Sequence, residues 1–60
     1  MDEFTKFLLS TMEQAAISGL CHDGQVEIVV QNARKLRPNL DRNELFQLAE
    51  EIYQLLQDSI

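Results

Sequence analysis

The chain has 60 residues, of which 45% are hydrophobic and 25% are charged, and its formal net charge is -5. This length allows a single domain over residues 1–60, and the hydrophobic share is typical of globular proteins and argues against disorder. The acidic charge opposes binding to nucleic-acid phosphates, one cysteine allows no internal disulfide, and no apolar run approaches the roughly 20 residues of a membrane span.

The first predicted helix runs from about Glu3 to Leu20. Asp2 is placed to act as its N-cap, and negative charge is favourable at the positive end of the helix dipole. Gly19 is a candidate for the C-terminal cap or for close approach of another backbone. The apolar residues recur at three- and four-residue spacing. They are Phe4, Phe7, Leu8, Met12 and Ala15, with Leu9, Ala16 and Leu20 widening the face.

The second predicted helix runs from about Gly24 to Leu36, with Asp23 as its N-cap. One stripe holds Val26, Val29, Val30, Ala33 and Leu36, which leaves Ile28 on the far side. Residues 25–31 are rich in β-branched side chains and partly alternate, so a strand paired with another copy is the alternative. The stripe continues to Leu36 and favours the helix, which Pro38 ends because proline disfavours a helical conformation in the residue before it.

The third predicted helix begins at Asp41, where Glu44 follows three residues later in a capping-box arrangement. Leu40 and Leu45 occupy the two positions of a hydrophobic staple. The apolar residues span about half of the helix circumference, against a stripe of about 100° for an ordinary surface helix. They are Leu45, Phe46, Leu48, Ala49, Ile52, Tyr53, Leu55 and Leu56. So wide a face is expected to contact the core and a partner as well.

The expected fold is all-α, a compact three-helix unit in an up-down-up arrangement that associates as a helical-bundle homodimer. Short chains often need such association for stability. The residues expected to be deeply buried are Phe4, Leu8, Val26, Leu45, Leu48 and Ile52. Aromatic residues at the edge of an apolar face often anchor protein contacts. The predicted partner or self-association interface is Leu9, Leu20, Phe46, Ala49, Tyr53 and Leu56.

Reactive side chains form no recognisable catalytic constellation in this sequence. Cys21 and His22 are adjacent but lack a third residue to orient them, so we expect Cys21 to be buried as a small hydrophobe. Two copies would have to pair their Cys-His groups to supply the four ligands of a zinc site. Glu50 and Glu51 fit a solvated helix face better than paired catalytic carboxylates. We therefore expect no enzyme activity and no catalytic, cofactor-binding or metal-binding residues.

Basic residues gather around the second connection, where they complement the dipole at a helix C-terminus or form an electrostatic contact patch for an acidic surface. They are Arg34, Lys35, Arg37 and Arg42. In a helix-turn-helix protein the third helix would read DNA, but here its polar face carries Glu44, Glu50 and Glu51, which phosphates would repel. Nucleic acid is therefore an unfavoured partner.

The expected function is that of a small non-catalytic protein–protein interaction or regulatory module acting through apolar helix faces. Its expected partner is a second copy of the chain, with another protein as a further partner and no membrane contact. One alternative is an accessory subunit or assembly factor of a larger enzyme complex, and a second is a small DNA-binding transcriptional regulator. The acidic segment Met1-Asp2-Glu3 stands where a secretion signal would be basic, so we expect a cytoplasmic protein.

Overall fold

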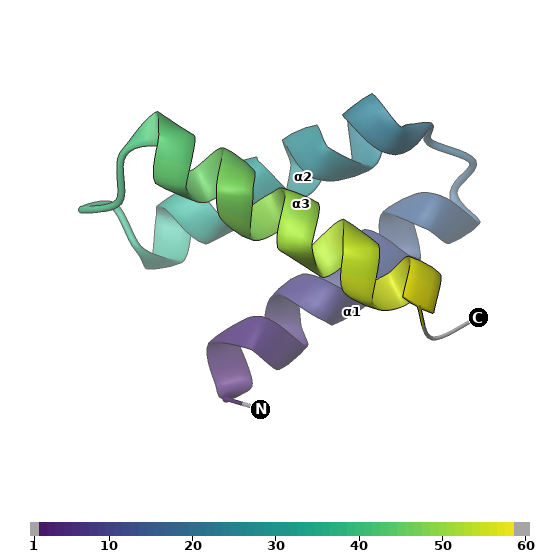
Figure 1. Cartoon of the computed structure of the whole chain (residues 1–60), viewed down its shortest axis with the longest axis horizontal. Coiled ribbons are helices and arrows are strands. Elements are labelled where there is room, and N and C mark those ends of the chain that lie inside the picture. The colour runs from purple at the N-terminus through teal and green to yellow at the C-terminus, as the bar shows by residue number, and fades with distance from the viewer. Residues whose placement is uncertain (1, 59–60) are drawn as a thin grey trace.

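Three helices pack together in the computed structural model, which describes residues 2–58. α1 spans Glu3–Ile17, α2 spans His22–Leu36 and α3 spans Arg42–Asp58. Successive helices run in opposite directions across the view, and α3 lies over the other two (Figure 1). The described residues contain no strand. The all-α prediction is confirmed, and the strand alternative for residues 25–31 is wrong because the apolar stripe of α2 packs as a helix.

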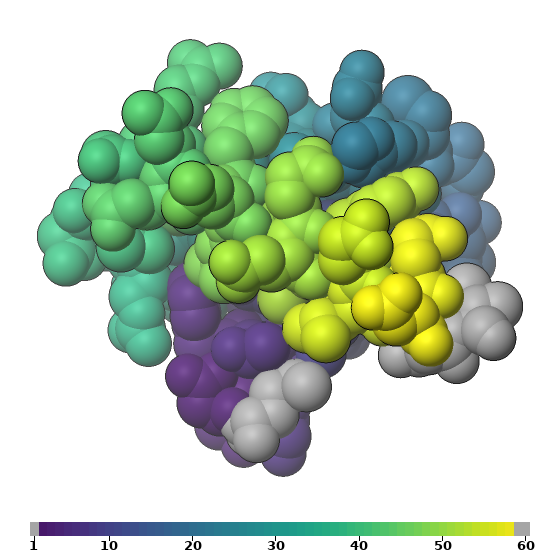
Figure 2. All heavy atoms as spheres, viewed as in Figure 1, coloured from purple at the N-terminus to yellow at the C-terminus, as the bar shows by residue number. Residues whose placement is uncertain are grey.

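The core lies where the three helices meet, and each helix contacts both of the others. Its buried residues are Leu8, Met12, Ala15, Val26, Val29, Ala33, Leu45, Ala49 and Ile52. In Figure 2 the side chains of α3, coloured green to yellow, lie between those of α1 and α2. The exposed area is 4250 Å², close to the roughly 4000 Å² expected of a monomeric protein of this length. One chain therefore exposes an ordinary total surface area for its length.

The predicted deep burial is confirmed for most positions but not for Phe4 and Leu48. Both are only half-buried and pack at the margin of the core. Phe4 lies in the first turn of α1, where the guanidinium of Arg37 stands 4.4 Å from its ring centroid. Leu48 lies beside Leu40 and lines a surface depression on α3. Both residues lie on the apolar helix faces that the sequence pattern predicted. Each side chain faces the rim of the core, where solvent still reaches it.

The predicted N-caps of α1 and α3 are confirmed. The Thr5 backbone N–H donates to Asp2 Oδ1 at 2.8 Å, and hydrogen bonding with the Thr5 side chain and backbone lowers the pKa of Asp2. In α3 the Glu44 N–H donates to Asp41 Oδ1 at 2.8 Å, and the Asp41 N–H donates to Glu44 Oε1 at 3.2 Å. These two bonds are the reciprocal pair of a capping box, which fixes the start of α3.

The first connection contains the predicted C-terminal cap at Gly19, but both of its ends differ from the prediction. Gly19 has a φ of +89°. The Leu20 N–H donates to the Ala15 carbonyl at 3.2 Å, and the Gly19 N–H donates to the Ala16 carbonyl at 3.0 Å. These are the two bonds of a Schellman motif, which ends α1 at Ile17, three residues earlier than predicted.

α2 begins at His22, so the predicted N-cap at Asp23 is wrong. The N-cap is Cys21, which is extended and makes no side-chain capping bond. The Gly19 turn has already redirected the chain, and the first helical bond joins the Gln25 N–H to the Cys21 carbonyl at 2.9 Å. Asp23 lies within the first turn, where its charge still faces the positive end of the dipole. The predicted end of α2 at Leu36 is confirmed.

Replacing Gly19 with alanine tests the turn that ends α1. A Cβ at this position would meet no atom within 4 Å, so any loss of stability comes from the backbone conformation alone. The left-handed region costs about 1–2 kcal/mol for a residue with a Cβ. Urea unfolding followed by circular dichroism should show a loss of this size. Gly19→Asn should lose less, because asparagine tolerates this region, and equal losses for both variants would contradict this account of the turn.

Candidate functional site: grooves between the helices

Within residues 2–58, six large apolar side chains remain exposed although the core is complete. They are Phe7, Ile17, Leu20, Leu36, Phe46 and Leu55, with exposed fractions from 36% to 80%. Three of them belong to α1 or to the connection after it, and two belong to α3. The wide apolar arc of α3 is therefore largely used inside the chain, and much of the remaining apolar surface lies on α1.

The residues predicted to form the interface do not share one surface. Ala49 is 0% exposed, because this small side chain is buried where α3 packs on the other helices, so it presents no surface to a partner in this structure. Leu9, Tyr53 and Leu56 are half-buried against the core. The two exposed members, Leu20 and Phe46, line different grooves, one beside α1 and one beside α3. For the five residues other than Ala49, the interface remains a prediction.

The first groove lies between α1 and α2, has a volume of about 450 Å³ and is called here the α1–α2 groove. Its lining residues are Phe7, Thr11, Gln14, Ala15, Ser18, Leu20, Ile28 and Asn32. None of these eight carries a charge, in a chain where 25% of the residues are charged. The sequence contained one signal for this groove, since Ile28 lies off the apolar stripe of α2. Ile28 therefore faces Phe7 and Leu20 across the groove rather than the core.

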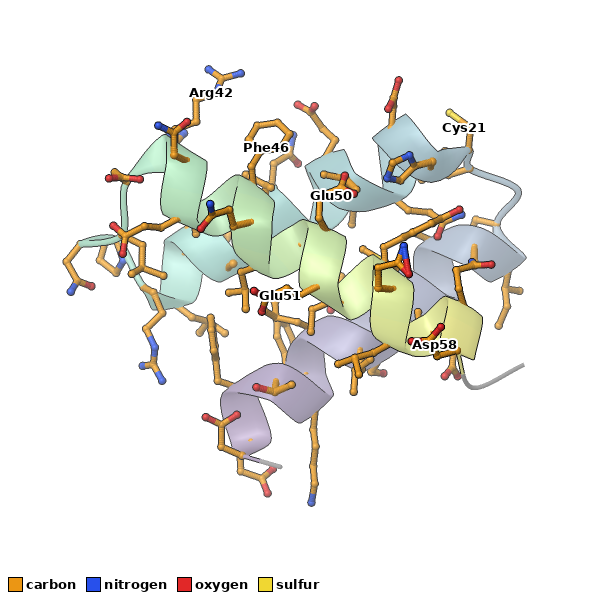
Figure 3. The ribbon with its side chains drawn as sticks, in the orientation of Figure 1. Cys21, Arg42, Phe46, Glu50, Glu51 and Asp58 are labelled. Atoms are coloured by element: carbon orange, nitrogen blue, oxygen red, sulfur yellow. The ribbon has the colours of Figure 1, made fainter. Side chains whose placement is uncertain are left out.

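The second groove lies between α2 and α3, has a volume of about 150 Å³ and is called here the α2–α3 groove. It is lined by Glu27, Val30, Gln31, Arg34, Arg42 and Phe46. The guanidinium carbon of Arg42 lies 5.7 Å from the ring centroid of Phe46. Figure 3 shows these two side chains projecting from the same side of α3. The groove thus joins two members of the predicted basic patch to one of the predicted apolar contact residues.

The four basic residues around the second connection have different surroundings. Arg34 and Arg42 share the α2–α3 groove, whereas Arg37 stands over Phe4 of α1 and Lys35 lines neither groove. Within residues 2–58 the ion pairs are Lys6–Glu3 at 3.8 Å and His22–Glu50 at 2.9 Å. None of the four is ion-paired in that part of the chain. The electrostatic contact patch of these four residues remains a prediction.

A cluster that no local sequence pattern indicated joins the start of α2 to α3. His22 Nε2 donates to the Glu50 carboxylate, at 2.9 Å to Oε1 and 3.2 Å to Oε2. The centroid of the His22 ring also lies 4.3 Å from the centroid of the Tyr53 ring. The His22 and Glu50 side chains are 44% and 50% exposed, so solvent weakens their interaction and it contributes little to stability. Twenty-eight residues separate the two, and no local pattern could have paired them.

The thiol of Cys21 is exposed, so the predicted burial of this residue is wrong. Cys21 is the extended N-cap residue of α2 and precedes the first turn that packs on α3. Figure 3 shows its side chain at the outer end of α2, pointing away from Glu50. The neighbours Cys21 and His22 therefore point to different surroundings, and the structure does not pair them.

A third depression follows the outer face of the C-terminal half of α3. It has a volume of about 430 Å³ and is lined by Glu50, Glu51, Gln54, Leu55 and Asp58. Three carboxylates border it, and Figure 3 shows Glu50, Glu51 and Asp58 along this half of the helix. The solvated face predicted for Glu51 is consistent with its exposure, whereas Glu50 is engaged by His22.

Within residues 2–58, no group of three His, Cys, Asp or Glu side chains could hold a metal ion. Neither is any helix there long and apolar enough to cross a membrane. No protein-family model, curated protein or solved structure matches the chain. The grooves and the side chains that line them are therefore the features of this protein that bear on its function.

Proposed function

We propose that this protein is a small non-catalytic interaction module that binds another protein chain through the α1–α2 groove. The observation that carries the proposal is an uncharged groove of about 450 Å³ in which Phe7 and Leu20 are 44% and 41% exposed. Grooves between helices bind amphipathic helices, whose apolar residues at three- and four-residue spacing fill them. The groove follows two neighbouring helices and offers such a partner apolar contacts along both walls.

The first occupant that we expect is a second copy of the chain, which gives a symmetric dimer. Molecules of net charge -5 repel one another, and they associate best through faces that bring no like charges together. The α1–α2 groove meets this condition because all of its lining residues are uncharged. A two-fold dimer uses the same surface on both partners, so the Phe7 and Ile28 side chains of each copy would pack against the groove of the other.

Substitution of Phe7 by glutamine tests this groove directly. Sedimentation equilibrium should show that Phe7→Gln weakens dimerisation by about tenfold, the effect of losing roughly 1.4 kcal/mol of contact energy. The matched control is Ile17→Gln, which removes an apolar side chain that is 80% exposed and does not line the groove. This control should dimerise like the unsubstituted chain.

The same three proteins, used as baits in cell extract, test binding to other partners. Any partner bound in the groove should be recovered by the unsubstituted chain and by Ile17→Gln, and lost with Phe7→Gln. A chain that stays monomeric at all concentrations, and whose Phe7→Gln variant captures the same proteins as the unsubstituted chain, would contradict the proposal. Recovery of a larger enzyme through Phe7 would identify the module as an accessory subunit.

DNA binding has less support from the arrangement of charges. The exposed face of α3 carries Glu44, Glu50 and Glu51, which oppose the approach of phosphates. Of the basic residues, Arg34 and Arg42 line the α2–α3 groove, whereas Arg37 lies over Phe4 of α1. We therefore place protein binding before nucleic-acid binding as the function of this fold.

A further inference from the structure

We propose that the α2–α3 groove is a separate contact site for an acidic peptide segment of a partner protein. A carboxylate of that segment lies between Arg34 and Arg42, and the apolar side chain next to it packs on Phe46. The inference rests on the proposed function in one respect, that the protein binds other proteins. It adds the chemistry of a second contact, which the uncharged α1–α2 groove does not provide.

The two guanidinium groups are available to a ligand. The Arg34 side chain makes no hydrogen bond or ion pair among residues 2–58, and the Arg42 guanidinium lies over the Phe46 ring. The two residues come from different helices and line the same groove. A guanidinium presents paired N–H donors that match the two oxygens of a carboxylate. Two such groups in one groove therefore favour a bound carboxylate over a neutral group.

The position of Arg42 is not explained by the stability of its own helix. Arg42 is the first residue of α3, where the positive end of the helix dipole disfavours a cation. Arg34, in contrast, lies in the last turn of α2, where the dipole favours it. A charge placed against the local preference is a common sign of a functional position. Binding an anion beside Arg42 would remove this unfavourable interaction.

The size and charge of the groove limit what it can hold. Two arginines and Glu27 give a local charge of 2 − 1 = +1, which one carboxylate neutralises. A volume of about 150 Å³ is below the roughly 300 Å³ at which sites for whole small molecules begin. This space suits one or two side chains of a peptide. A nucleic acid needs a longer row of basic side chains to contact successive phosphates, and the Glu27 carboxylate in this groove would repel them.

Phe46 and Gln31 supply the remaining contacts. Phe46 is 36% exposed, so part of its ring is free to cover an apolar side chain of the ligand. Gln31 lines the same groove and carries amide N–H groups that donate to a carboxylate or a peptide carbonyl. Arginine beside a partly exposed aromatic ring is a frequent combination in the parts of interfaces that contribute most to binding. The ligand is therefore a carboxylate followed by an apolar residue.

The test is a nuclear magnetic resonance titration of the ¹⁵N-labelled full chain at low salt. The probes are the blocked dipeptides acetyl-Glu-Leu-amide and acetyl-Gln-Leu-amide, which differ in one charge. The glutamate peptide should shift the side-chain Nε–H signals of Arg34 and Arg42 and the backbone signal of Phe46. The glutamine peptide should bind about tenfold more weakly, because a charge-assisted hydrogen bond is roughly twice as strong as a neutral one.

Three variants separate this site from a general charge effect. Arg34→Gln and Arg42→Gln should each weaken binding of the glutamate peptide by about tenfold, as expected when one charged partner is lost. The matched control Lys35→Gln removes a neighbouring cation that does not line the groove and should leave binding unchanged. The proposal is overturned if both peptides bind equally or neither binds, or if Lys35→Gln weakens binding as much as Arg34→Gln. It is also overturned if a short single-stranded DNA shifts the same signals at lower concentration than the peptide.

The Phe7→Gln variant distinguishes failure of this site from failure of the proposed function. It should lose dimerisation and keep the peptide response, since Phe7 does not line the α2–α3 groove. If the unsubstituted chain does not respond to the glutamate peptide but its association still depends on Phe7, only the site in the α2–α3 groove is overturned and the proposed function stands.

Discussion

Replacing Ile52 with alanine should lower the free energy of unfolding by about 2–5 kcal/mol. The Ile52 side chain is 1% exposed and belongs to the central core cluster. Its truncation removes buried methyl groups and leaves a cavity, because helices packed on both sides relax only partly. A single core of this size seldom supplies more than about 3–5 kcal/mol, so the variant should be largely unfolded at 25 °C. Far-ultraviolet circular dichroism with urea unfolding measures the effect.

Ile17→Ala is the control for the Ile52 variant, because it makes the same chemical change at a position that is 80% exposed. Its effect should stay within about 0.5 kcal/mol, as is usual for surface substitutions. If the two variants lose the same stability, Ile52 is not in the core of the protein in solution. If both lose almost nothing, the stability does not come from the packing of these helices.

Enlarging Ala49 to leucine should lower the free energy of unfolding by about 1–3 kcal/mol. Ala49 is 0% exposed, and a leucine there forces the neighbouring helices apart or takes an unfavourable rotamer. The control Ala16→Leu makes the same change at an exposed position of α1. Circular dichroism with urea unfolding should show almost no loss for the control.

The Ala49→Leu variant also distinguishes the buried position of Ala49 in the structure from the interface position predicted from the sequence. If Ala49 lay at a partner interface, leucine would add apolar surface there, strengthen association and leave the monomer stable. The buried position predicts the opposite, a destabilised monomer. Sedimentation equilibrium beside the unfolding measurement distinguishes the two outcomes, and stronger association with unchanged stability would show that Ala49 is not in the core.

The parts of the fold that the sequence predicted are those that depend on neighbouring residues. The capping box of Asp41 and Glu44 needs only a spacing of three residues, and the structure contains both of its bonds. The start of α2 depends instead on how the Gly19 turn redirects the chain. The sequence placed the N-cap of this helix at Asp23, whereas the structure has it at Cys21. An aspartate near a helix start serves equally as a cap or as a first-turn charge, and only the path of the preceding turn decides between them.

The grooves could be predicted only in part, because each depends on residues from two helices. Helical periodicity placed Ala49 and Phe46 in one apolar arc, but how deeply each side chain is buried depends on where the other helices cross α3. The sequence also grouped Arg34 and Arg42 with two other cations, whereas the structure joins these two to Phe46. The pairing of His22 with Glu50 across 28 residues was beyond the reach of any local pattern.

The accessible sulfur atom at the beginning of α2 affects every measurement of self-association. Cys21 is the sole cysteine in the chain and its side chain is solvent-facing. Two molecules that meet in air can therefore become covalently cross-linked through a disulfide, and such a product sediments like a dimer whatever the grooves do. Association that persists in reducing buffer, or in a Cys21→Ser chain, is the association that belongs to the helices.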